Sequence, residues 1–128
     1  MSARKAKTKL LITERALRDI AEIETYSVTE WGRRAASKYI GEIEAALVRL
    51  QESPGLLRPE ATLHPELCFY CVNKHFLVCD RQPGAIFLLT VIHASRDIPS
   101  RLAEMQPTLA HEVELLHRQL EQGKKPRK

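Results

Sequence analysis

The sequence predicts an α+β domain in which an N-terminal helix hairpin packs on a small antiparallel sheet of three to four strands, with an extra C-terminal helix. Apolar residues recur at helical spacing over the first half of the chain, strand-like runs follow, and helical spacing returns near the end. The chain has 128 residues, of which 44% are hydrophobic and 28% charged, and this suits a single domain with one core.

Two amphipathic helices are expected in the first half of the chain. The first spans 13–31, with Thr13 as its N-cap, Glu14 at the positive end of its dipole and Gly32 as the residue that ends it. The second ends at Ser53-Pro54-Gly55 and has the clearest apolar stripe in the sequence. That stripe consists of Ala36, Tyr39, Ile40, Ile43, Leu47 and Leu50. Because the link between them is short, the two helices should form an antiparallel hairpin.

Strands are expected in the middle of the chain. Runs 67–72, 76–81 and 85–93 are separated by turn residues and predict a three-strand antiparallel meander. The third run is nearly all apolar, which is typical of a central strand buried on both faces. Residues 10–12 could join the sheet as a fourth strand, and the proline-containing stretch 56–66 indicates an irregular connection.

The C-terminal part is expected to be helical. A turn at 94–99 leads to a short helix at 100–105, and Pro107 starts a separate last helix that reaches position 122. This last helix has an apolar stripe, which more often marks core packing than self-association. The stripe consists of Leu109, Val113, Leu116 and Leu120. We therefore expect a folded domain at 10–105 and a helical extension at 106–123.

The net charge of +4 is unevenly distributed along the chain. All sixteen acidic residues but only twelve of the twenty basic ones lie between positions 10 and 123, so the folded part carries a net charge of −4. The remaining basic residues lie in two tails, 1–9 and 124–128, which we expect to be disordered. This distribution argues against a domain whose whole surface binds a nucleic-acid backbone.

The sequence predicts neither a metal site nor a cofactor. Cys68-x-x-Cys71 resembles half of a zinc site, but residues three apart on a strand point to opposite faces, and no second pair exists. A hairpin turning at Asn73-Lys74 places Cys68 opposite Cys79, where two small core residues are favoured over a disulfide. The odd cysteine count, with no signal peptide and no apolar run of about 18 residues, favours the cytoplasm and no membrane partner.

Residues suited to chemistry gather where the third predicted strand ends. His93 could act as a base or hydrogen-bond partner, and Arg96 could hold a phosphate or a carboxylate. In the alternative interpretation, a salt bridge between Arg96 and Asp97 locks the turn and caps the helix that follows. Both interpretations remain open at the level of sequence.

Four motifs follow one another in a fixed order over residues 9–105. They are Ala16-Leu17-x-Asp19-Ile20-x-x-Ile23-x-x-Tyr26, Trp31-Gly32-x-x-x-Ala36-x-x-Tyr39, Ser53-Pro54-Gly55-x-x-Arg58-Pro59 and Val91-Ile92-His93-Ala94-Ser95-Arg96-Asp97. With the predicted elements, they resemble the RelE/ParE superfamily of type II toxin–antitoxin toxins, and the ParE branch more than the RelE branch. Where many members have a Tyr-Arg pair at the start of the second meander strand, this chain has His75-Phe76.

The resemblance implies a plasmid-stabilisation-like toxin that inhibits DNA gyrase. It also implies a cognate antitoxin that lays a helix or strand across the toxin, partly on the apolar meander, with operator DNA bound only through that complex. Two alternatives on the same fold are a RelE-like mRNA endonuclease acting on the ribosome and a non-toxic interaction protein. Endonuclease activity of the RelE type depends on basic and imidazole side chains on the sheet. The candidates for such a catalytic role are Lys74, Arg81, His93 and Arg96, with His75 beside them.

Overall fold

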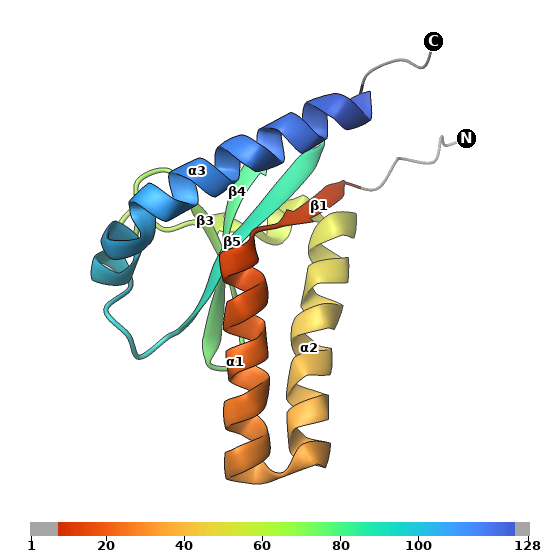
Figure 1. Cartoon of the computed structure of the whole chain (residues 1–128), viewed down its shortest axis with the longest axis vertical. Helices are drawn as coiled ribbons and strands as arrows, with labels where there is room; N and C mark the ends of the chain where they lie inside the picture. Colours follow the sequence, from red (N-terminus) through yellow and green to blue (C-terminus); the bar gives the residue numbers. More distant parts are fainter. Residues whose placement is uncertain (1–7, 125–128) are drawn as a thin grey trace.

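The computed structural model describes residues 8–124, which fold into three layers (Figure 1). A helix hairpin packs on one face of a five-stranded sheet, and a single long helix packs on the other face. The α+β class is therefore confirmed. Most of the two predicted basic tails lies outside the described residues, at 1–7 and 125–128.

The hairpin consists of α1 (Glu14–Trp31) and α2 (Arg33–Glu52), as the apolar periodicity predicts. The Thr13 hydroxyl accepts a hydrogen bond from the Ala16 N–H at 2.9 Å, which confirms Thr13 as the N-cap of α1. Gly32 joins the helices with φ = 91°, a value at which a side chain would be strained. No helix in the described residues is both long and apolar enough to cross a membrane.

The sheet has the strand order β1-β5-β4-β3-β2. Its strands are β1 (Lys9–Ile12), β2 (Arg58–Pro59), β3 (Cys68–Val72), β4 (His75–Gln82) and β5 (Ala85–His93). The predicted meander of β3, β4 and β5 is confirmed, with Cys68 opposite Cys79. The prediction of a purely antiparallel sheet of at most four strands is wrong in detail, because β1 pairs with β5 in parallel and β2 adds a fifth strand.

The C-terminal part is one helix, α3 (Ile98–Lys124), with Pro107 inside it. The prediction of two helices separated at Pro107 is wrong. Proline lacks the N–H that would bond to the Ala103 carbonyl, but Met105 and Leu109 on either side of it are both buried against the sheet. Tertiary packing therefore keeps the helix continuous, and the predicted core role of its apolar stripe is confirmed.

Both faces of the sheet are covered by the chain itself. The hairpin covers residues such as Leu77 and Leu88, while α3 covers Phe69, Phe87 and Leu89. Every residue of β5 from Ala85 to Ile92 is buried. The meander therefore has no open apolar face among the described residues, since the hairpin and α3 cover its two sides (Figure 1). Docking of an antitoxin partly on the meander stays a prediction.

On the side of β5 that faces away from β4, the end of the strand is held by α1 because β1 stops short of it. Beyond Ile12, where β1 stops, the Thr13 hydroxyl donates to the Leu89 carbonyl at 2.7 Å. Further along, the Asp19 carboxylate accepts hydrogen bonds from the Val91 N–H and the Thr90 hydroxyl. These contacts fix the position of α1 relative to the strand that ends at His93.

Candidate functional site

A cleft of about 800 Å³ opens between the hairpin and the end of β5. Its walls come from α1, α2, the β3–β4 turn with the start of β4, the last residues of β5 with the turn that follows them, and the start of α3. Asn73 in the β3–β4 turn adopts φ = 54°, a conformation that asparagine tolerates better than most residues. We call this cavity the hairpin cleft.

The hairpin cleft brings together three of the four predicted site residues. Lys74, His93 and Arg96 all line it. Arg81 does not, because it pairs with Ile86 near the β4–β5 turn, at the other end of β4. It lies seven positions along the strand from Lys74, which corresponds to roughly 20 Å. The four candidates therefore do not form one site.

A row of aromatic rings runs along the hairpin cleft, and only its two histidines were among the site residues that the sequence suggested. The ring row consists of Tyr26, Trp31, Tyr39, His75 and His93, with successive ring centroids 6.0, 6.3, 5.6 and 5.0 Å apart. Tyr26 and Trp31 are more than half exposed, at 59% and 56%. The sequence holds one signal for this row, because three of the four Tyr and Trp residues of the chain fall within the two predicted hairpin helices and belong to it.

The inner part of the ring row is hydrogen-bonded. The Tyr39 hydroxyl lies 2.6 Å from His75 Nδ1 and accepts from the Lys74 N–H at 3.4 Å. Burial raises the pKa of Tyr39, while burial and the neighbouring His93 lower the pKa of His75 to about 4. Both side chains are therefore neutral near pH 7. We infer that Tyr39 donates to Nδ1, which leaves the imidazole hydrogen on Nε2.

His93 has a similar arrangement at the outer end of the row. Its Nδ1 accepts from the Ser95 N–H at 3.0 Å and lies 2.8 Å from the Ser95 hydroxyl oxygen. In neutral His93 this places the ring hydrogen on Nε2, as in His75. Since each histidine uses its accepting nitrogen on a donor of the protein, neither offers a free base to a substrate. The arrangement suits binding better than general-base catalysis.

The two interpretations of Arg96 and Asp97 are separated by the structure. Asp97 accepts hydrogen bonds from the N–H and the hydroxyl of Ser100, at 3.3 and 2.9 Å, and so caps the start of α3. The described residues contain no ion pair between Arg96 and Asp97. Of the alternative interpretation, the helix cap by Asp97 is therefore present and the salt bridge is not. Arg96 is instead exposed and lines the hairpin cleft.

The charge of the hairpin cleft differs from that of the rest of the folded part. Five of the basic side chains of the described residues line it, against three acidic ones. The basic residues are Arg15, Lys38, Lys74, Arg96 and Arg101. Of the acidic residues, Asp19 is bonded to β5 and Glu42 accepts from Asn73. A net positive cleft on an acidic body favours an anionic partner at this place.

The cysteines are free thiols, and they do not form a metal site. Cys68 is half-buried and Cys71 exposed, while burial strongly raises the pKa of the Cys79 thiol, which keeps it protonated. Among the residues that the structure describes, no three His, Cys, Asp or Glu side chains lie together as metal ligands would.

Comparison with known proteins gives consistent matches. Residues 10–98 match the family described as "ParE toxin of type II toxin-antitoxin system, parDE". Toxin ParE of Escherichia coli is 26% identical over 98 residues, which are 76% of this chain and 95% of that protein. Toxin ParE1 of Caulobacter vibrioides is 28% identical over 91 residues, which are 71% of this chain and 94% of that protein.

A solved structure shares the fold. It is titled "Chromosomal ParDE TA system from P. aeruginosa" and matches with a TM-score of 0.62 at 16% identity, over 70% of this chain and 98% of that one. The family match ends at residue 98, where α3 begins. These matches support the ParE interpretation and not the RelE alternative. The chain belongs to the ParE toxin family of type II toxin–antitoxin systems.

Proposed function

We propose that this toxin inhibits DNA gyrase in the cytoplasm and that it contacts gyrase through the hairpin cleft. Membership of the ParE family supports a toxin paired with a cognate antitoxin, and the resemblance to the ParE branch implies gyrase as the target. The observation that carries the assignment of the surface is the gathering of exposed rings and basic side chains in one cleft. Aromatic and arginine side chains are the residue types that dominate protein interfaces energetically.

The proposed roles follow from exposure. Trp31 and Tyr26 present large apolar surfaces that a protein partner can bury, while Lys74 and Arg96 are exposed cations beside them. His93 donates from Nε2 to an acceptor on the partner. Inhibition by binding requires no free catalytic base, which agrees with the hydrogen bonding of both histidines.

The test is a supercoiling assay with purified gyrase, relaxed plasmid and ATP. We expect the wild-type toxin to inhibit supercoiling and Arg96→Ala to require at least about tenfold more protein, as for loss of an interface arginine. Arg81→Ala is the matched control, because it removes an exposed arginine outside the cleft and should inhibit like the wild type. Full gyrase activity at a large excess of folded wild-type toxin would show that gyrase is not the target.

A further inference from the structure

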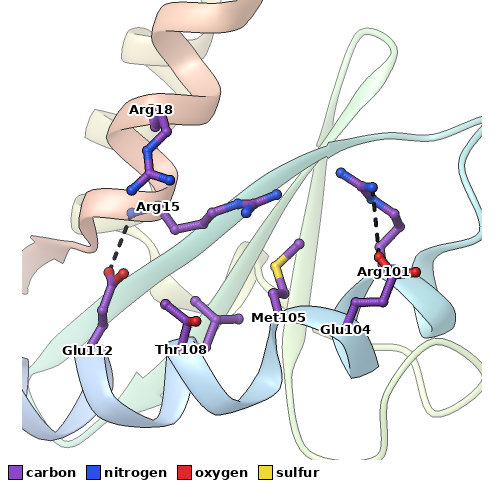
Figure 2. Close-up of a pocket in the computed structure, with 8 residues that line it drawn as sticks. Arg15, Arg18, Arg101, Glu104, Met105, Thr108 and Glu112 are labelled. Carbon is purple, nitrogen blue, oxygen red and sulfur yellow. Dashed lines mark hydrogen bonds and ion pairs between the residues drawn. The ribbon is translucent and has the colours of Figure 1, made fainter.

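A second cavity, of about 330 Å³, lies between α1 and α3 and is lined by three arginines (Figure 2). They are Arg15 and Arg18 from α1 and Arg101 from α3. Arg15 and Arg101 also line the hairpin cleft, so the two cavities adjoin at this pair. A partner lying in the hairpin cleft therefore reaches the arginines without leaving the protein surface.

Arg15 and Arg101 extend toward each other across the gap between the two helices (Figure 2). The Nε atoms of both are buried without a hydrogen-bond partner among the described residues, although Arg15 Nε lies 3.3 Å from Asp19 Oδ1 as an ion pair. Buried guanidinium donors without acceptors are unfavourable, because each has lost its water without replacement. An anion between the two arginines would supply acceptors to both.

The neighbouring carboxylates of the chain neutralise this pair only in part, and Arg101 less than Arg15. Glu112 accepts from the Arg15 backbone N–H at 3.4 Å and so serves the N-terminus of α1 (Figure 2). Glu104 is 71% exposed and lies 3.9 Å from Arg101, a long ion pair of little energetic weight. Asp19 divides its oxygens, because Oδ2 accepts from the Thr90 hydroxyl and the Val91 N–H while Oδ1 lies 3.3 Å from Arg15 Nε. The pair thus keeps an attraction for a carboxylate from outside the chain.

We propose that an acidic segment of the cognate antitoxin lies in the hairpin cleft and places a carboxylate between Arg15 of α1 and Arg101 of α3. Planar guanidinium groups bind carboxylates through paired hydrogen bonds. The same segment packs an apolar side chain on Trp31, the exposed ring at the other end of the cleft. The inference rests on the proposed function in one respect, namely that this toxin is neutralised by an antitoxin.

A protein carboxylate fits these observations better than a nucleic acid. The arginine cavity is small and lies between two helices, which suits one side chain rather than a backbone of successive phosphates. The folded part of the chain is also acidic outside the clefts, which disfavours a polyanion. The hairpin and α3 cover the two faces of the sheet. The adjoining cavities are therefore where an antitoxin finds exposed rings together with arginines whose Nε atoms lack a hydrogen-bond acceptor.

Arg101 lies just beyond the part of the chain that matches the family model. The family match ends at residue 98, three residues before Arg101. Half of the arginine pair is therefore contributed by a helix outside the matched family region. The proposal makes α3 an element that selects the antitoxin as well as a cover for the sheet.

The experiment is calorimetric titration of the full-length toxin with the antitoxin encoded beside it. We expect Arg101→Glu to weaken binding by at least about tenfold, because reversal sets two carboxylates against each other. Arg118→Glu is the control: it lies on the same helix, is exposed and lines neither cavity, so its affinity should stay within about twofold of the wild type. Circular dichroism checks that both variants remain folded.

Three outcomes would overturn the inference. The first is that Arg101→Glu and Arg118→Glu bind the antitoxin with equal affinity. The second is that the wild type does not bind the antitoxin. The third is that a DNA or RNA oligonucleotide displaces the bound antitoxin and that binding of this oligonucleotide depends on Arg101. The supercoiling assay separates this inference from the proposed function. A toxin that inhibits gyrase but binds antitoxin independently of Arg101 refutes only the inference, whereas Arg101-dependent binding with fully active gyrase refutes only the proposed target.

Discussion

The Asp19 carboxylate on α1 accepts a hydrogen bond from the backbone N–H of Val91 on β5 at 3.1 Å. It also accepts from the Thr90 hydroxyl and forms an ion pair with Arg15. Strand β1 ends before this part of β5, so a helix side chain takes the place of a neighbouring strand. The bond fixes both walls of the hairpin cleft, since α1 carries Tyr26 and β5 ends at His93.

Removal of this carboxylate should destabilise the fold. Asp19→Ala leaves the Thr90 hydroxyl and the Val91 N–H buried without their acceptor, and we expect a loss of about 2–4 kcal/mol in the free energy of unfolding. Urea denaturation measures it. Glu24→Ala, an exposed substitution on the same helix, should change stability by less than about 0.5 kcal/mol. Similar losses in the two variants would refute the anchoring role of Asp19.

Substitution of Pro107 tests the continuity of α3. In a helix interior Pro107→Ala restores a backbone hydrogen bond to Ala103 and should raise the free energy of unfolding by about 1–2 kcal/mol. Pro99→Ala, in the first turn of the same helix where proline is tolerated, should change it by less than about 0.5 kcal/mol. If Pro107 instead began a separate helix, its replacement would give no gain in thermal or urea stability.

The fold was largely predictable because its elements have local signals. Helical periodicity, the Thr13 cap and the turn at Gly32 predict the hairpin, and alternation with turn residues predicts the meander. The helix through Pro107 was not predictable, since its continuity depends on contacts between α3 and Phe87 or Phe69, far away in sequence. Local propensity favoured a break there, and tertiary packing overrode it.

The site was only partly predictable for a related reason. His93 and Arg96 are close in sequence and were both assigned, whereas the ring row joins residues from α1, α2, β4 and β5. Arg81 was assigned on residue type alone, and its position at the far end of β4 excludes it from the cleft. Sequence shows which side chains are available, but strand register decides which of them meet.

Stability should depend on pH through His75. Its pKa is about 4 in the folded chain and near the ordinary 6.5 in the unfolded chain, so only the unfolded chain takes up this proton between these values. The contribution of neutral His75 to the free energy of unfolding is therefore fully present above pH 6.5 and is lost as the pH falls toward 4. Because the ring is only half-buried, we expect a slope well below about 1.4 kcal/mol per pH unit.

Variants at two histidines isolate this contribution. His75→Gln should flatten the fall in the free energy of unfolding between pH 6.5 and 4, measured by urea denaturation at several pH values. His111→Gln removes an exposed histidine of α3 and should leave the pH dependence of the wild type unchanged. Equal slopes in the wild type and His75→Gln would mean that His75 titrates normally in the folded chain.

The central claim is that this ParE-family toxin acts through the hairpin cleft, and growth of bacteria after induced expression tests it most directly. We expect the wild type and Arg81→Ala to arrest growth, and Trp31→Ala with Arg96→Ala to abolish the arrest while the variant accumulates as folded protein. Normal growth with the wild type, or an arrest that survives loss of both Trp31 and Arg96, would contradict the account.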